Sequence, residues 1–178
     1  MRCVSCNNMG RLWLCLLLLL VSACKTDAVQ EPAAAVVKAT LLAQSSFCQA
    51  ESTAPFMRLL TDDVAYKSVY SQARASVPGN TDSPPAVDFA RFSVIAVYMG
   101  RRRTSGYQLG LASQSARVGE NKNLHLLVSW SEPPAGTLLA QVMTSPCMLV
   151  TIQKGSYSGI RVIDEQGNVR ITGNTGRE

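Results

Sequence analysis

The stretch FSVIAVYMGRRRTSGYQLGLAS, residues 92–113, decides the fold class expected for this chain. Residues 92–99 form a dense apolar run, which suits a central strand of a sheet. Three arginines then interrupt the run, and residues 106–113 return to a strand-like pattern. Gly100 and Gly106 bound the interruption, and glycine permits backbone conformations that other residues resist. The stretch therefore predicts two strands joined by a solvated turn; the alternative is that the arginines form a charged site for an acidic partner.

The segments on either side continue the strand pattern. Every second residue from Leu124 to Trp130 is apolar, which places these side chains on one face of a sheet. Further strands are expected at 56–60, 138–143, 147–153, 159–164 and 169–172, with a hairpin turn at 165–168 between the last two. Residues 36–44 predict an early strand, with a helix as the competing interpretation because alanine and leucine are frequent there.

One segment instead has the period of a helix. Apolar residues at 66, 69, 70 and 73 follow the i, i+3, i+4, i+7 spacing of a single helical face. Thr61 or Asp62 can cap the first turn, and acidic residues there complement the helix dipole. The expected fold is therefore α+β: a mostly antiparallel sheet, sandwich-like or curved, with one helix packed on it near residues 62–74.

The N-terminal segment MRCVSCNNMGRLWLCLLLLLVSACK predicts a lipoprotein signal peptide. A basic start precedes an apolar run that is shorter than the roughly 20 residues of a transmembrane helix. Residues 21–24, Val-Ser-Ala-Cys, resemble the bacterial lipobox. This resemblance implies cleavage after residue 23, a diacylglyceryl group on Cys24 and an N-terminal acyl chain such as palmitate. An ordinary cleaved signal and an uncleaved anchor are the alternatives. Lys25 favours the outer membrane, facing the periplasm, in a Gram-negative envelope.

The expected processing changes the charge and the cysteine content. Removal of residues 1–23 leaves 178 − 23 = 155 residues, enough for one domain, and a charge of 17 − 2 − 12 = +3. We expect a lipid-attached tether at 24–35, a single domain at 36–172 and a flexible tail at 173–178. Cys48 and Cys147 would be the two remaining thiols, and an oxidising periplasm favours a disulfide between them over two separate buried thiols.

Residues suited to catalysis are scarce. His125 has the opposite parity to the apolar side of its strand, so it should point away from the main core face and no triad role is expected for it. Cysteine and histidine are not spaced as zinc ligands, and no phosphate-binding glycine motif is present. We therefore expect no enzyme, no metal and no cofactor. The mild positive charge and the envelope address argue against a nucleic-acid partner.

Two polar junctions between strands, at residues 100–107 and 144–147, carry a family resemblance. The segments Val-Asp-Phe at 87–89, VIAVYMGRRRTSGYQLGL at 94–111, EPPAG at 132–136 and VMTSPCMLVTI at 142–152 occur in this order. They resemble the C-terminal domain of the PrcB family, which is named for a lipoprotein subunit of a spirochaete surface protease complex. The resemblance covers roughly residues 56–164 and is best over 87–153. Ser105 replaces a usual glycine, and Cys147 replaces a usual tyrosine.

The resemblance implies an accessory or assembly role beside a protease, without catalytic residues. We expect a lipid-anchored, non-enzymatic binding or scaffold domain with a protein partner, while the oligomeric state stays open. A chagasin-like protease inhibitor, suggested by the similar T-T-G-Y loop of that family, and a purely structural lipoprotein are the alternatives. The expected partner loop consists of Arg101, Arg102, Arg103, Thr104, Ser105, Gly106, Tyr107, Thr144, Ser145 and Pro146.

Overall fold

The computed structural model describes residues 35–75 and 83–175 of the chain. Residues Ala34–Glu178 group as one unit by their internal contacts. The predicted signal peptide at 1–23, Cys24 with the tether up to residue 34, and residues 176–178 of the predicted tail lie outside the described residues.

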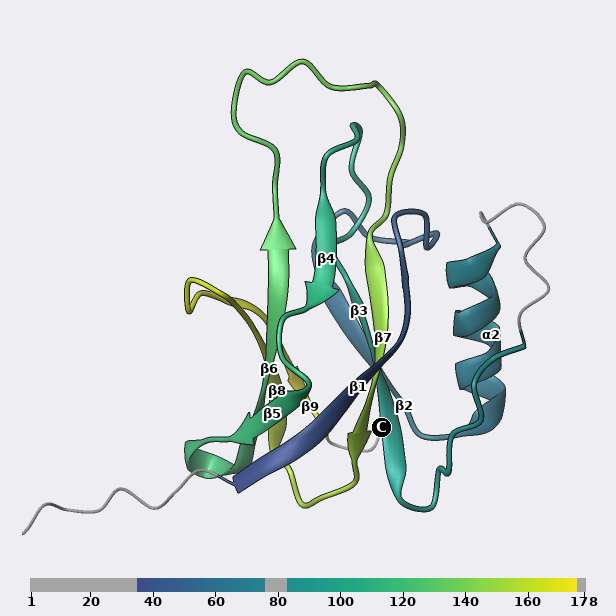
Figure 1. Ribbon diagram of the computed structural model, residues 1–178, viewed down its shortest axis with the longest axis vertical. Helices are drawn as coiled ribbons and strands as arrows, with labels where there is room; N and C mark the ends of the chain where they lie inside the picture. Colours follow the sequence, from purple (N-terminus) through teal and green to yellow (C-terminus); the bar gives the residue numbers. More distant parts are fainter. Residues whose placement is uncertain (1–34, 76–82, 176–178) are drawn as a thin grey trace, which may run out of the picture. The chain divides into compact units, whose positions relative to one another are not determined.

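The described residues contain nine strands and a single α-helix (Figure 1). In chain order the elements are β1 (Ala35–Ser45), β2 (Phe56–Leu60), α2 (Asp63–Arg74), β3 (Phe92–Tyr98), β4 (Gln108–Leu111), β5 (Ser115–Val118), the short 3-10 helix η1 (Glu120–Lys122), β6 (Asn123–Ser131), β7 (Cys147–Gln153), β8 (Gly159–Asp164) and β9 (Val169–Asn174). The predicted α+β class with a mostly antiparallel sheet and one packed helix is confirmed.

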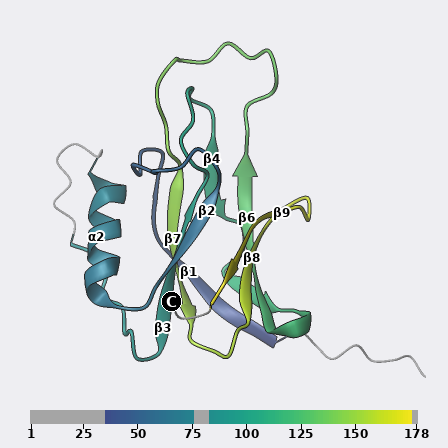
Figure 2. The ribbon, with the colours of Figure 1, turned by 180° about the vertical axis from the view of Figure 1, so that it is seen from behind.

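The strands form one nearly closed sheet in the order β2-β3-β7-β1-β5-β6-β8-β9, and β4 also pairs with β6. All pairs are antiparallel except β6 and β8, which are parallel. Strand β1 connects the two halves of the curved sheet, because its first residues pair with β5 and its later residues pair with β7. The two edge strands come close where Met57 of β2 lies against Gly173 of β9. Figure 2 shows the same arrangement from behind.

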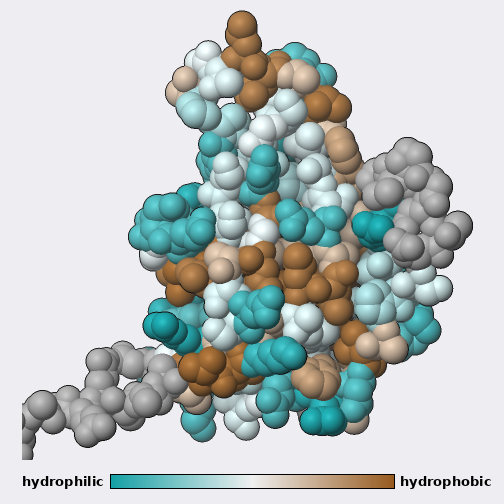
Figure 3. Space-filling view, in the orientation of Figure 1, coloured by the Kyte–Doolittle hydropathy of each residue, from teal (hydrophilic) through white to brown (hydrophobic). Residues whose placement is uncertain are grey.

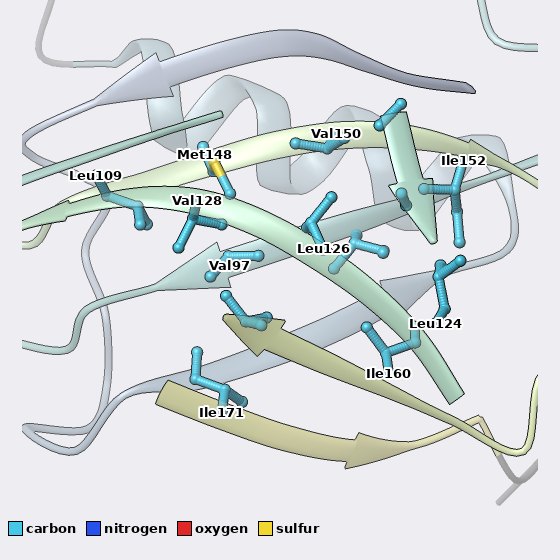
Figure 4. Close-up of a cluster of buried hydrophobic side chains, with 14 of the residues drawn as sticks. Val97, Leu109, Leu124, Leu126, Val128, Met148, Val150, Ile152, Ile160 and Ile171 are labelled. Atoms are coloured by element: carbon cyan, nitrogen blue, oxygen red, sulfur yellow. The ribbon is translucent and has the colours of Figure 1, made fainter. Parts of the chain in front are cut away.

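Two apolar clusters explain the dense runs in β3 and β7. The interior cluster lies inside the curved sheet, where side chains of β3, β4 and β7 meet those of β6, β8 and β9 (Figure 4). The second cluster lies on the outer face, between the sheet and α2, and includes Tyr66, Tyr70, Val94 and Leu149. Because β3 and β7 are covered on both faces, most of their residues are buried and apolar.

The helix begins as its sequence predicts. The Asp62 carboxylate accepts a hydrogen bond from the Ala65 amide at 2.9 Å, which caps the free N–H groups of the first turn. Tyr66, Val69, Tyr70 and Ala73 form the buried face. Burial, with the neighbouring Tyr70 and Asp63 adding to it, raises the pKa of Tyr66 to about 12.

Four sequence expectations differ from the structure. The competing helix at 36–44 is wrong, because β1 occupies this segment. The expected strand at 138–143 is also wrong: it lies in the loop between β6 and β7, where no neighbouring strand satisfies its backbone. Strand β5 was not expected from its four residues, Ser-Ala-Arg-Val. Strand β9 extends two residues into the predicted tail, because Gly173 pairs with Ile160 and Asn174 with Gly159.

Candidate functional site

The two polar junctions singled out in the sequence meet at one end of the sheet. Strands β1 and β3 end beside the start of β7, with Ser45 and Tyr98 both paired to Cys147. The loops that follow or precede these strands therefore gather at this end, which lies at the top of Figure 1. We call residues 46–50, 100–107 and 132–146 the loop end.

A backbone bridge joins the junctions directly. The Arg102 amide donates to the Thr144 carbonyl at 2.8 Å, and the Thr144 amide donates to the Arg102 carbonyl at 2.9 Å. The Thr144 hydroxyl donates to the Thr104 carbonyl at 3.0 Å. Hydrogen bonds thus connect residues some 40 positions apart in sequence, and they hold the arginine turn against the Thr-Ser-Pro-Cys segment.

Gly100 is required where the arginine turn begins. Its φ is +82°, and a Cβ atom there would lie 2.4 Å from the Thr53 carbonyl oxygen. The next amide, of Arg101, donates to the Ser52 carbonyl at 2.8 Å. Gly100 therefore lets the turn pack against the segment between β1 and β2, with a backbone conformation that other residues adopt at a cost.

The Thr-Ser-Pro-Cys segment lies beneath the surface and organises the loops. The Ser145 amide donates to the Ser46 carbonyl at 2.8 Å, and the Ser145 hydroxyl accepts from the Ala50 amide at 2.9 Å. The predicted disulfide between Cys48 and Cys147 is confirmed, with their Cα atoms 5.9 Å apart. Thr144, Ser145 and Pro146, which the sequence suggested for the partner loop, are buried, so they hold the exposed residues in place.

The three arginines have different environments. Arg101 and Arg103 are exposed, whereas Arg102 is half-buried. The Arg102 guanidinium donates to the Met99 carbonyl at 2.7 Å, and its carbon lies 5.2 Å from the centroid of the Tyr107 ring. Tyr107 is itself half-buried against the interior cluster. Arg102 therefore packs against Tyr107 and supports the turn. The guanidinium groups of Arg101 and Arg103 remain exposed and carry the charge that solvent or a partner can reach.

The turn closes against the long loop that follows β6. The Ser105 amide donates to the Ala140 carbonyl at 3.1 Å, and a Cβ atom on Gly106 would lie 3.2 Å from side-chain atoms of Leu139 and Pro133. Gly106 has a φ of +96°, whereas Ser105, which replaces the family's glycine, is not among the described residues with positive φ. The serine therefore fits this turn without strain.

The loop end also exposes apolar side chains, two of which lie in the segment 138–143 that the sequence predicts to be a strand. Leu138 is 99% exposed, Met143 56% and Phe47 44%. Figure 3 shows hydrophobic side chains at the tip of this end. Phe47 and Met143, but not Leu138, line a hollow of about 190 Å³, together with Gln49, Arg101, Thr144 and Ser145. The signal in the sequence was an apolar run, LLAQVM, that does not alternate and follows Pro133, Pro134 and Gly136.

Two ionisable residues outside the loop end, His125 and Asp164, have environments that explain them structurally. His125 is half-buried on the outer face of β6, as its parity predicted. Asp164 is buried at the start of the predicted hairpin turn, where it accepts from the Asn168 amide at 2.8 Å and from Arg170 Nε at 2.7 Å. Burial alone would raise the pKa of Asp164, but the hydrogen bonds and the charge of Arg170 outweigh it and lower this pKa to about 2.

The described residues contain neither a metal-ligand cluster nor a membrane-spanning helix. No cluster of three or more histidine, cysteine, aspartate or glutamate side chains in residues 35–75 and 83–175 could hold a metal ion. Over the same ranges, no helix has both the length and the hydrophobicity needed to span a membrane.

Fold and site together define a β-rich domain that presents loops from one end of a curved sheet. The family model described as PrcB C-terminal matches residues 93–153, and this match confirms the predicted resemblance over that segment. The match runs from β3 to the end of β7 and contains both junctions and the loop between β6 and β7. The family is an accessory, non-catalytic type of domain. No curated protein and no solved structure matches the chain.

Proposed function

We propose that the chain is a lipid-anchored, non-enzymatic accessory domain of the bacterial envelope that binds a protein partner, a component of a protease complex, through its loop end. The observation that carries this proposal is the exposure of Leu138, Met143 and Phe47 beside two free arginines, mostly within the family-matched segment. The family match supports an accessory role in a protease complex.

The composition of the loop end suits a protein interface. Contiguous exposed apolar side chains mark interaction sites, and arginine is enriched at such sites. Arg101 and Arg103 would form a charged rim that attracts an acidic partner surface and accelerates association. The apolar side chains would supply the area that the complex buries, which is where most binding energy arises.

The loops are held before any partner arrives. The Cys48–Cys147 disulfide, the bridge between Arg102 and Thr144 and the hydrogen bonds of Ser145 fix three chain segments relative to one another. Ordering a flexible loop on binding costs free energy, so this fixed arrangement favours affinity. A merely structural lipoprotein would have no use for exposed leucine and methionine on a rigid support.

The position of the loop end also suits an anchored protein. Strand β1 begins at Ala35, where the proposed tether from Cys24 joins the domain, and ends at Ser45, beside the loop end. Ten steps of about 3.3 Å separate the two ends of this strand by roughly 33 Å. A lipid on Cys24 would therefore hold one end of the sheet near the membrane and leave the loop end accessible. The lipobox supports this anchor, and Lys25 supports the outer membrane.

Co-purification of the full chain from its own membranes tests the proposal. The double variant Leu138→Glu/Met143→Glu should lose the co-purifying partner by at least about tenfold, because each charge would be desolvated in an apolar interface. Val64→Glu is the matched control, since Val64 is 79% exposed on α2, away from the loops, and it should retain the partner. Equal recovery with both variants would refute the loop end as the binding surface.

A further inference from the structure

A row of basic side chains crosses the outer face of the sheet, far from the loop end. Arg117 of β5 pairs with His125 of β6, and His125 pairs with Arg161 of β8. Neighbouring strands lie about 4.8 Å apart, so the three side chains project from backbone positions within roughly 10 Å. Lys38 of β1 shares this face two residues beyond Val36, which pairs with Arg117, and Lys122 lies in η1 just before β6. We call Lys38, Arg117, Lys122, His125 and Arg161 the tether face.

Except for Glu120 in η1, the carboxylates of the described residues lie elsewhere. Glu51 pairs with Arg58 and Glu132 with Arg170, Asp63 pairs with Lys67 on α2, and Asp164 is buried. Asp88 lies in the segment before β3, and Glu165 lies in the turn beyond the far end of β8. Within the described residues, Arg117 and Arg161 form no ion pair, and both are exposed. The tether face thus carries four formal positive charges against the one negative charge of Glu120 in η1, an excess of 4 − 1 = +3.

This surface lies beside the point where the tether joins the domain. Ala35, the first residue of β1, pairs with Val118, and Val36 pairs with Arg117. Ala35 lies 35 − 24 = 11 positions after Cys24 in the sequence. Covalent geometry limits the span of 11 residues to at most roughly 40 Å. The ionisable residues of this segment, Lys25, Asp27 and Glu31, sum to −1 and do not cancel the charge of the tether face.

We infer that the tether face docks on anionic lipid headgroups of the membrane that holds the acyl chains. This inference rests on the lipid anchor of the proposed function. Each Lys or Arg near an anionic bilayer favours the bound state by about fivefold. Because the lipid already holds the domain at the surface, the effective headgroup concentration is high and a few charges suffice. Val36 and Leu127, which are 66% and 37% exposed on the same face, add apolar contact. Docking fixes one orientation of the domain relative to the bilayer.

The test uses the full chain purified from membranes with its N-terminus as the cell leaves it. A nitroxide label on Thr172→Cys, a position of β9 paired with Arg161, reports access of a water-soluble relaxation agent. The protein is placed in phosphatidylcholine vesicles with or without phosphatidylglycerol. We expect access at Thr172 to fall by at least about twofold in the anionic vesicles. A label on Gln141→Cys, in the loop end, should report equal access in both.

Charge variants decide the cause of any protection. Arg117→Gln/Arg161→Gln should weaken docking by roughly 25-fold and restore access, whereas Arg117→Lys/Arg161→Lys should keep the protection. Equal access at Thr172 in both vesicle types would overturn the inference. So would protection that requires added membrane proteins or polysaccharide, which would assign the face to another partner.

The two proposals can fail separately. Intact mass of the N-terminal peptide shows whether Cys24 carries lipid. If Cys24 carries lipid and Thr172 is not protected, the lipid anchor is upheld and docking of the tether face is refuted. If Cys24 carries no lipid, the proposed anchor is refuted, and sedimentation of the same protein with the two vesicle types tests docking of the tether face. Binding to the anionic vesicles alone would support docking, and no binding would overturn it.

Discussion

Removal of the Cys48–Cys147 disulfide should cost the domain a large part of its stability and loosen the loop end. The two cysteines are 99 residues apart in sequence, and both are almost completely buried. In the chain-entropy model a loop of this length corresponds to about 4.7 kcal/mol at 25 °C. For a domain of this size, such a loss lowers the melting temperature by about 10–20 °C.

The structure also predicts where the loss is felt first. Cys48 follows Phe47, which forms a bridge with Ser145, and the Cys48 amide donates to the Ser145 carbonyl at 3.0 Å. Without the covalent link, only noncovalent contacts, among them these bonds and the bonds of Ser46 and Ala50 with Ser145, hold the segment between β1 and β2 to the start of β7. Amide hydrogen exchange at Cys48, Ala50 and Ser145 should therefore accelerate more than exchange in β6 or β8.

Chemical and thermal unfolding measure the effect in two independent ways. The variant Cys48→Ala/Cys147→Ala and the reduced wild-type chain should lose similar stability relative to the oxidised chain, since both remove the same constraint. Mass measurement of alkylated protein establishes which chains carry free thiols. A difference below about 1 kcal/mol between oxidised and reduced chains, or two free thiols in protein from an oxidising compartment, would refute the reasoning.

Three further predictions follow from other parts of the structure. Gly100→Ala should destabilise the domain by at least about 2 kcal/mol more than Gly136→Ala in urea unfolding, because both positions have φ near +80° but only Gly100 faces a backbone oxygen at 2.4 Å; equal losses would show that no contact is involved. Asp164 titrates with a pKa of about 2 in the folded chain against 3.8 ordinarily, so its contribution is fully present above about pH 4 and disappears as pH falls towards 2; Asp164→Asn should flatten the stability profile in this window, and an unchanged profile would contradict the assignment. Arg101→Ala/Arg103→Ala should slow partner association and reduce its salt dependence without changing the melting temperature, because both side chains are exposed; a salt dependence like that of the wild type would remove the arginines from the interface.

The local pattern of the sequence was enough to locate most elements. The dense runs at 92–99 and 147–153 correspond to β3 and β7, because strands covered on both faces leave little room for polar residues. The helical spacing from Tyr66 to Ala73 and the cap at Asp62 located α2. The pairing of Cys48 with Cys147 could be predicted because these are the two thiols that remain after the expected cleavage and lipidation, in a compartment that favours disulfides.

Features that depend on contacts between distant parts of the chain could not be predicted from local sequence patterns. Strand β5 has four residues and forms because β1 and β6 lie on either side of it. The parallel pairing of β6 with β8 and the near closure of the sheet leave no local signal. Residues 138–143 have the apolar content of a strand, yet no strand lies beside them, so Leu138 is exposed. The two junctions of the candidate site were recognised as separate motifs, but their contact through Arg102 and Thr144 required the fold.

Site-specific photocrosslinking in the native membrane shows whether the loop end contacts a protein partner. A photoreactive residue in place of Leu138, at the loop end, is compared with one in place of Val64 on α2; both positions are highly exposed and apolar. We predict a discrete adduct with one protein at position 138, belonging to a protease complex, and none at position 64. The same adducts at both positions, or no adduct at position 138, would contradict the account of the loop end as a partner-binding surface.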